Sequence, residues 1–397
     1  MFTKIRFEHF KCFKKLQLQL APLTMLSGTN ATGKSTILQS FALLHQTIAE
    51  NERSKSLLLN GDLATLGAAS DVIDKITGRR DFMIGLDSDT VECTWTLHAE
   101  DHFALSVPIK NITWREADAW QIIKTDYLEN DTALMQCLLP LELFNNATHA
   151  KPFTDTIARL TYISSDRIGP QETYSKGSSG RHITVGLRGE RTPWFLEYFA
   201  DEKPIPDLLR KDAPPQLQRQ TEAWMRHFFP GTRFVIQAVR NANLVTMGIR
   251  TSDATDFHRP QNVGYGLTHT LPILAACLGA KMNDLILIEN PESHLHPSGQ
   301  AEMGEFLAKC ASAGLQIILE THSDHILNGI RRAVKKQVIK PDEVALHFFQ
   351  PRPDIKSHQN KSQVISPLID IAGNLSEWPE NFFDQFDKDT NFLIGWG

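Results

Sequence analysis

The pattern of apolar and polar positions changes near residue 35. Up to residue 26, apolar residues alternate with polar ones, which is typical of strands that bury one face. From Ser35 the apolar spacing becomes helical, through Ile37, Leu38, Phe41 and Leu44. Between the two patterns, a short strand at Leu23–Leu26 runs directly into Gly28. The chain is therefore predicted to open with strands, a glycine-rich turn and a helix.

Strand-like patterns return twice further along the chain. Residues 81–115 alternate again, which predicts an antiparallel sheet in the first lobe. After residue 233, strand and helix patterns alternate, which predicts a largely parallel sheet. Strands are expected at Arg233–Ala238, Leu244–Ile249, Leu285–Ile288 and Gln316–Leu319, and helices from about Leu267, at Gly299–Ala311 and at Asp324–Val334.

The segment between residues 116 and 232 has a mixed pattern. Helices are expected at Ala117–Leu128 and Pro215–Phe229, and a short strand at Leu160–Ile163. No heptad pattern is sustained, so a long coiled coil is excluded. We expect an α/β fold in four parts. Residues 1–115 and 233–345 form one head, 116–232 form an inserted, mostly helical lid subdomain, and 346–397 form a C-terminal extension.

The glycine-rich turn carries a specific phosphate-binding pattern. Residues Gly28–Ser35 form a complete G-x-x-x-x-G-K-[ST] motif between a strand and a helix. Glycines let successive backbone amides surround phosphate oxygens, and the positive end of the following helix faces the anion. Lys34 would neutralise phosphate charge and Ser35 would bind Mg²⁺. The expected binding segment is Gly28, Thr29, Asn30, Ala31, Thr32, Gly33, Lys34, Ser35 and Thr36.

Two later strands end in residues suited to the same site. The apolar strand Leu285–Ile288 is followed by Glu289, which we expect to bind the metal beside the phosphate loop. The strand Gln316–Leu319 precedes His322, which could hydrogen-bond the terminal phosphate or the attacking water. The neighbouring Ser323 or Asp324 could also cap the next helix, and the two interpretations are compatible.

Four segments together resemble the ABC-type ATPase heads of the RecF/SMC and OLD branch. They are His9–Phe13, the phosphate loop, Glu289–Pro297 and Thr321–Ser323. The tail from Gly373 to Asp384, with Trp378-Pro379 and Phe382-Phe383-Asp384, is similar to that of a bacterial group of stand-alone AAA-type ATPases. The resemblance implies a P-loop NTPase fold with a parallel-core lobe and an antiparallel lobe, and ATP and Mg²⁺ as cofactors.

The resemblance also implies a homodimer, or a higher oligomer, in which ATP lies between two heads. Each phosphate loop would be completed by a partner's signature segment, which here corresponds to Asn262–His269. This segment departs from the usual serine-glycine-glycine-glutamine form, so the donor could be Gly264, Gly266 or Thr268. An ordinary helix start is the alternative interpretation.

Asn290 stands where this superfamily usually has the glutamate that activates water. An amide cannot take a proton at neutral pH, and a general base typically contributes about 10²–10⁴-fold. Either Glu292 or Glu289 substitutes for it, or hydrolysis is slow. The expected catalytic set is Lys34, Glu289, Asn290, Glu292 and His322.

Three further features allow both a functional and a plain structural interpretation. The turn Asp166–Pro170 resembles an Arg-containing turn of the same ATPases and could reach the nucleotide or a partner, or be exposed. A basic helix face could contact DNA, although a solvated face is the commoner explanation; it comprises Arg331, Arg332, Lys335 and Lys336. Four histidines could suggest zinc, which the lack of a nearby cysteine disfavours; they are His294, His296, His322 and His325.

Composition narrows the function classes. Lys and Arg number 41 against 46 Asp and Glu, a net charge of −5, which excludes a globally basic nucleic-acid coat. The five cysteines contain no CxxC pair, so no disulfide framework is supported and a cytoplasmic location is expected. The longest apolar stretch, Leu271–Ala280, falls well short of the ~20 residues that a bilayer requires, so no membrane association is expected.

The sequence thus predicts an ATP-binding, slowly hydrolysing ATPase that dimerises around ATP and regulates or scaffolds a separate effector. About 60 residues follow the helix at Asp324–Val334, and they lack the clustered acids of a two-metal nuclease. By family analogy the effector would be a nuclease or toxin of prokaryotic antiviral defence. The alternative is a RecF-like repair clamp that uses ATP to close on duplex DNA.

Overall fold

The computed structural model describes residues 1–76, 78–116, 119–123, 134–177, 182–252, 254–352, 362–380 and 382–394. It divides the chain into two compact units. The first unit comprises Met1–Ala21, Thr29–Leu160 and Phe349–Gln363, and the second comprises Pro22–Gly28, Thr161–Phe348 and Val364–Gly397. Residues 116–232 are divided between the units, with the change after Leu160.

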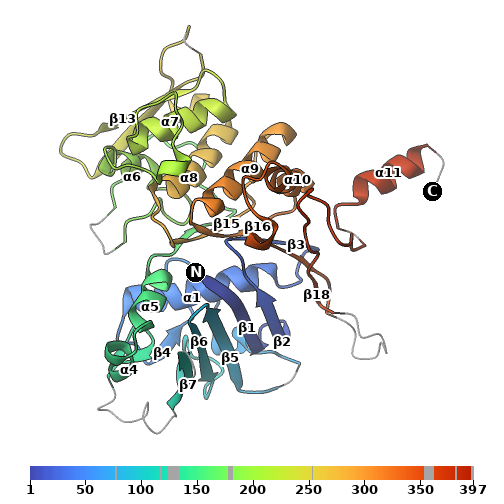
Figure 1. Ribbon diagram of the computed structural model, residues 1–397. Helices are drawn as coiled ribbons and strands as arrows, with labels where there is room; N and C mark the ends of the chain where they lie inside the picture. The colour runs from blue at the N-terminus through green and yellow to red at the C-terminus, as the bar shows by residue number, and fades with distance from the viewer. Residues whose placement is uncertain are drawn as a thin grey trace. The chain divides into compact units, whose positions relative to one another are not determined.

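The first unit is built on an antiparallel sheet of seven strands (Figure 1). Its strand order is β2-β1-β5-β6-β7-β4, with β8 paired to β7. The strands are β1 (Phe2–Phe10), β2 (Phe13–Gln19), β4 (Ser56–Leu58), β5 (Asp81–Ser88), β6 (Val91–His98), β7 (Ser106–Glu116) and β8 (Ala119–Ile123). The antiparallel sheet predicted for residues 81–115 is therefore confirmed.

Helix α1 (Lys34–Glu50) and smaller elements complete the first unit. These are α2 (Ala69–Val72), the short pair β9 (Met135–Gln136) and β10 (Leu139–Pro140), α4 (Leu141–Asn146) and α5 (Ala150–Ala158). The turn between β1 and β2 places the rings of Phe7, Phe10 and Phe13 in the buried core, with Phe7 and Phe10 centroids 5.2 Å apart. The alternating apolar residues in the sequence are thus those whose side chains point to the buried face of the sheet.

One expected helix is a strand. Residues 119–123, within the expected helix Ala117–Leu128, form β8, which pairs antiparallel with β7 so that Trp120 lies opposite Arg115. Trp120, Ile122 and Ile123 are aromatic or β-branched and favour a pleated strand, so strand pairing outweighs the local helical pattern. Residues 117–118 and 124–128 of that expected helix lie outside the described residues.

The second unit contains a six-stranded sheet with the order β11-β15-β16-β3-β17-β18. Its strands are β3 (Leu23–Gly28), β11 (Thr161–Ile163), β15 (Leu285–Glu289), β16 (Gln316–Glu320), β17 (Val344–Phe349) and β18 (Val364–Ile365). β11, β15, β16 and β3 run parallel. β15 and β16 are continuous buried runs because helices cover a parallel sheet on its faces, which confirms the α/β class and the parallel arrangement predicted for these two strands.

Four of the helices of the second unit, α7 to α10, lie close to their expected positions, whereas α6 and α11 were not predicted. They are α6 (Thr192–Tyr198), α7 (Leu217–Phe228), α8 (Tyr265–Gly279), α9 (Pro297–Ser312), α10 (Asp324–Lys335) and α11 (Gln385–Leu393), with short 3₁₀ turns at Pro206–Leu208, Pro260–Asn262 and Pro341–Glu343. A separate antiparallel sheet joins β12 (Tyr174–Ser175), β14 (Leu244–Arg250) and β13 (Arg233–Ala238), so the expectation that β13 and β14 belong to the parallel sheet is wrong. Figure 1 shows α8, α9 and α10 beside the parallel sheet.

Helices α9 and α10 pack through two glycines. A Cβ added at Gly304 would lie 2.3 Å from the carbonyl oxygen of Ile326, and one at Gly329 would lie 2.1 Å from that of Ala301. No side chain fits at either position, so the backbones of the two helices are in direct contact there. This contact fixes α10, which begins two residues after His322.

Candidate phosphate site and its acidic strand end

The phosphate loop has the backbone conformation that its glycines predict. Gly28 and Gly33 have φ of 136° and 102°, and Ala31 between them has φ of 60°. Gly33 is also packed tightly, because an added Cβ would lie 2.5 Å from both Cys12 Sγ and a Phe13 ring carbon. The His9–Phe13 turn therefore supports the loop from behind, and only glycine meets both conditions at position 33.

The N-terminus of helix α1 lies at this loop. Gly33 gives it no side-chain cap, and no acidic residue lies in its first turn. The first helical residue is Lys34, which is buried and whose Nζ donates to the carbonyl oxygen of Thr29 at 2.8 Å. The Thr32 hydroxyl donates to the same carbonyl at 2.8 Å, while Thr29–Ala31 are exposed. The positive helix end and the lysine both favour a bound anion.

The sheet of the second unit places the start of the loop and Glu289 at one edge. In the strand register Glu289 lies opposite Glu320, and Glu320 lies opposite Leu26, two residues before Gly28. Since parallel strands are spaced about 4.8 Å apart, Glu289 and Leu26 are about 10 Å apart across β16. The carboxyl ends of β15 and β3 thus share the edge at which α/β folds bind ligands.

The carboxylate of Glu289 is oriented by two donors. Its Oε1 accepts a hydrogen bond from the Tyr162 hydroxyl at 2.5 Å, and its Oε2 accepts one from the backbone N–H of Ser165 at 2.9 Å. Tyr162 belongs to β11, the neighbour of β15 in the sheet. Burial, and then the charge of Glu289, raise the pKa of Tyr162, so the hydroxyl remains a donor.

Arg167 binds the end of β15 from the same turn. Its guanidinium donates to the carbonyl oxygens of Glu289 at 2.7 Å and Asn290 at 2.6 Å. Arg167 is buried, and this burial lowers its pKa to about 10, opposed by the charges of Glu292 and Glu289. The Arg-containing turn therefore contacts the strand end in the same unit, and Arg167 is not the exposed turn residue of the alternative interpretation.

Asn290 has a left-handed backbone, with φ of 44°. Asparagine tolerates this region better than other non-glycine residues. The local conformation thus gives a structural reason for the asparagine, independent of its chemistry.

Glu292 connects the end of β15 to the end of β16. Its Oε2 accepts from the Thr321 hydroxyl at 2.8 Å, and its Oε1 accepts from the backbone N–H of His322 at 3.0 Å. His322 is exposed and precedes Ser323, whose side chain caps α10 by accepting from the N–H groups of His325 and Ile326. The capping interpretation is confirmed for Ser323.

The signature-like segment forms the start of a helix, and its two glycines differ in how closely they are packed. Gly264 precedes α8 in an extended conformation, and an added Cβ there meets no atom within 4 Å. A Cβ at Gly266 would lie 2.7 Å from the carbonyl oxygen of His294, so Gly266 is needed for packing. The Thr268 hydroxyl donates to Tyr265 O within the helix at 3.0 Å.

Two of the four histidines and three residues of the basic helix face have structural partners. His294 packs against His269 with ring centroids 4.5 Å apart, and His296 caps α9 through the N–H of Ser298. Among the described residues, no group of three His, Cys, Asp or Glu side chains is arranged to bind a metal ion. On α10, Arg331 donates to Gly373 O at 2.7 Å, and Arg332 and Lys336 both pair with Glu305. The observed pairing favours the structural interpretation of this face over DNA contact.

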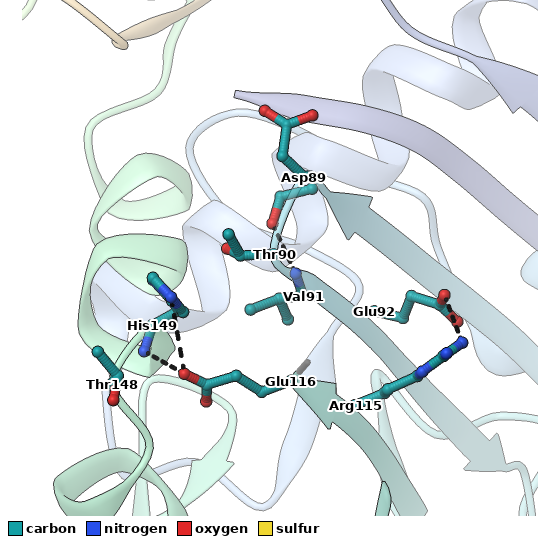
Figure 2. Close-up of a pocket in the computed structure, with 9 residues that line it drawn as sticks. Asp89, Thr90, Val91, Glu92, Arg115, Glu116, Thr148 and His149 are labelled. Carbon is teal, nitrogen blue, oxygen red and sulfur yellow. Dashed lines mark hydrogen bonds and ion pairs between the residues drawn. The ribbon is translucent and has the colours of Figure 1, made fainter. Parts of the chain in front are cut away.

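The sequence reasoning missed a pocket of about 430 Å³ in the first unit (Figure 2). It lies at the β5–β6 turn and the end of β7. Figure 2 shows the ion pair between Glu92 and Arg115 and the hydrogen bond from the backbone N–H of His149 to the Glu116 carboxylate. The nitrogen–oxygen distance is 3.1 Å in both. No phosphate-loop residue lines this pocket. No helix in the described part of the chain is long and apolar enough to cross a membrane.

Family models match three parts of the chain. Residues 1–162 match a family described as "AAA ATPase domain", and residues 189–328 match one described as "AAA domain, putative AbiEii toxin, Type IV TA system". Residues 339–393, which include the predicted C-terminal extension motif, match a family described as "Protein of unknown function (DUF3696)". No curated protein matches the chain. The two ATPase-domain matches cover the phosphate loop and the acidic strand end respectively.

Among solved structures, three similar chains are heads of SMC proteins. An Smc head bound to the C-winged helix domain of ScpA is 14% identical, with 92% of this chain and 97% of that chain covered and a TM-score of 0.46. The SMC head domain from Thermotoga maritima is 10% identical, with 88% and 94% covered and a TM-score of 0.41. The Pyrococcus furiosus Smc head with an extended coiled coil, bound to the C-terminal domain of ScpA, is 11% identical, with 99% and 98% covered and a TM-score of 0.47. Likenesses at this level do not decide function.

Proposed function

We propose that this chain binds ATP with Mg²⁺ and hydrolyses it slowly, as a dimerising head that regulates a separate effector protein. The observation that carries the proposal is the phosphate loop, with Gly28 at the same sheet edge as Glu289. The matches to AAA ATPase domains support the nucleotide and the general activity.

The residues present fit a magnesium–triphosphate group. The segment Gly28–Thr36 supplies an uncapped helix start, and Lys34 supplies a cation to the phosphates. Ser35 and Glu289 would offer oxygen ligands, which Mg²⁺ prefers. When bound, the ion would offset charge on the phosphates. Lys34 and Glu289 lie in different units of the chain, so their convergence on one nucleotide is part of the proposal.

Hydrolysis is expected to be slow because the position of the usual general base holds Asn290. The carboxylate oxygens of Glu292 are held by Thr321 and His322, so this acid sets the position of His322 as well as being a candidate base. His322 would hydrogen-bond the terminal phosphate or the attacking water. Slow turnover suits a switch, whose ATP-bound state persists, better than a motor.

The dimer would use the start of α8 in trans. The surroundings of Gly264 are open, whereas Gly266 packs on its own subunit and Thr268 bonds within its own helix. Gly264 is therefore the residue that we place closest to a partner's nucleotide. The backbone amides of a helix start suit contact with phosphate.

The family matched by residues 189–328 is described as "AAA domain, putative AbiEii toxin, Type IV TA system", which supports a defence role, whereas the separate effector is what the sequence resemblance implies. We propose that the chain serves as the ATPase partner of a separate nuclease or toxin in prokaryotic antiviral defence, in the cytoplasm.

Equilibrium binding of a fluorescent ATP analogue tests the nucleotide site. Lys34→Ala is expected to abolish binding, because it removes the cation at the helix start. Lys14→Ala, at an exposed position of β2, is the matched control and should bind as the wild type does. Equal binding of the analogue by the wild type, Lys34→Ala and Lys14→Ala would contradict the proposed nucleotide site.

Light scattering of the purified protein with and without ATP tests the dimer. Gly264→Trp, at a position where an added Cβ meets no atom within 4 Å, should keep ATP binding while losing ATP-dependent dimerisation. A dimer unaffected by this substitution would contradict the trans contact. An ATP-dependent, salt-sensitive shift of duplex DNA would instead favour the RecF-like clamp.

A further inference from the structure

The end of β15 is held by strand β11 and the turn that follows it in the same unit. Residues Tyr162–Arg167 make four hydrogen bonds to Glu289 and Asn290. Two of them orient the carboxylate of Glu289, and two hold the backbone that follows it. The residues that matter are Tyr162 and Arg167, which the expected site did not include.

The hydrogen bond from Tyr162 restricts rotation of the Glu289 carboxylate. With Tyr162 donating to Oε1 and Ser165 N–H donating to Oε2, the Glu289 carboxylate cannot rotate without losing both bonds. Each oxygen keeps one lone pair, which is what a ligand to a small octahedral cation needs. Partners that orient a metal ligand typically contribute 10–100-fold to metal affinity.

Arg167 acts on the backbone. Its guanidinium binds two successive carbonyls at 2.7 and 2.6 Å, a fork that a lysine ammonium does not reproduce. The second carbonyl belongs to Asn290, whose left-handed conformation costs free energy and needs such support. Arg167 is nine-tenths buried, and its position is set from the same turn by a bond to Ser164 O at 3.1 Å.

We infer that Tyr162 and Arg167 are positioning residues that prepare Glu289 to bind the divalent cation of the nucleotide. The inference rests on the proposed function, since it concerns the metal of that same site. It predicts a loss confined to the metal: the affinity for Mn²⁺ falls, and the affinity for ATP without metal does not.

The experiment compares wild type, Tyr162→Phe and Tyr174→Phe. Tyr174 is a second buried tyrosine of this unit, and its hydroxyl contacts the Gln171 N–H rather than β15, so it is the matched control. Mn²⁺ affinity is read from the free-ion electron paramagnetic resonance signal in the presence of a non-hydrolysable ATP analogue. ATP affinity is measured separately in EDTA.

Tyr162→Phe is expected to weaken Mn²⁺ binding about 10–100-fold with unchanged ATP affinity in EDTA, and Tyr174→Phe to change neither. Arg167→Lys should weaken Mn²⁺ binding in the same direction; if it does not fold, Tyr162→Phe decides alone. Unchanged Mn²⁺ affinity in folded Tyr162→Phe overturns the inference. Absence of ATP binding by the wild type would instead overturn the proposed function.

Discussion

Substitution of Gly33 by alanine tests the phosphate loop through two independent costs. At φ of 102° an L-residue is disfavoured by about 1–2 kcal/mol. The added Cβ also lies 2.5 Å from Cys12 Sγ and from a Phe13 ring carbon, and such overpacking costs about 1–3 kcal/mol. The reduced freedom of the unfolded chain returns about 0.4–1 kcal/mol. The free energy of unfolding is therefore expected to fall by about 1–5 kcal/mol.

Urea denaturation followed by tryptophan fluorescence measures this change, with Gly299→Ala as the control. Gly299 lies in α9, where an added Cβ meets Leu295 at an ordinary 3.6 Å, so alanine there is expected to be neutral or stabilising by up to ~1 kcal/mol. In the Gly33→Ala background, Cys12→Ala should recover part of the packing loss and none of the backbone loss. A Gly33→Ala protein as stable as the wild type, with the same ATP affinity, would refute the loop geometry described here.

Three further predictions concern the second unit. Asn290→Glu should raise the single-turnover rate of ATP hydrolysis if position 290 activates water. Glutamate must adopt φ of 44° there, at a cost of about 1–2 kcal/mol. An unchanged rate places the general base elsewhere. Gly329→Ala should lower the free energy of unfolding by about 1–3 kcal/mol, because its Cβ would lie 2.1 Å from Ala301 O. An unchanged free energy of unfolding in urea denaturation would contradict the close contact of α9 and α10. The pKa of His269 is lowered to about 4 by burial and then by the charges of Arg167 and His294. The wild type should therefore lose stability as pH falls from 6.5 to 4, since only the unfolded state binds a proton there. His269→Gln should flatten the dependence of the free energy of unfolding on pH in this range, and an unchanged slope would show that other groups cause it.

Much of the fold follows from local pattern. The strands ending at Glu289 and Glu320 are unbroken apolar runs, which are typical of a parallel sheet buried on both faces, and their predicted bounds differ from the structure by one residue. The phosphate loop was equally clear, because Gly28 and Gly33 are needed where the backbone is left-handed. The error at Ala119–Ile123 arose because a strand that pairs with its neighbour can carry a helical spacing of apolar residues.

The supports of the site could not be predicted in this way. Tyr162 and Arg167 are more than 120 residues from Glu289 in sequence, and only the pairing of β11 with β15 brings them together. The apparent signal, an arginine in a turn after a short strand, does not reveal whether the guanidinium faces solvent or a strand end. Likewise, the basic face of α10 looks available in sequence, and its partners Glu305 and Gly373 come from other segments.

The central claim is that the loop at Gly28–Ser35 and the acid Glu289 serve one nucleotide, and cleavage by bound iron tests it most directly. Fe²⁺ replaces Mg²⁺ on the bound nucleotide, and ascorbate with peroxide then cuts the backbone close to the ion. The account predicts ATP-dependent cuts both near Ser35 and near Glu289, and their loss in Lys34→Ala. Cuts near Ser35 alone, with the chain around Glu289 intact, would contradict it.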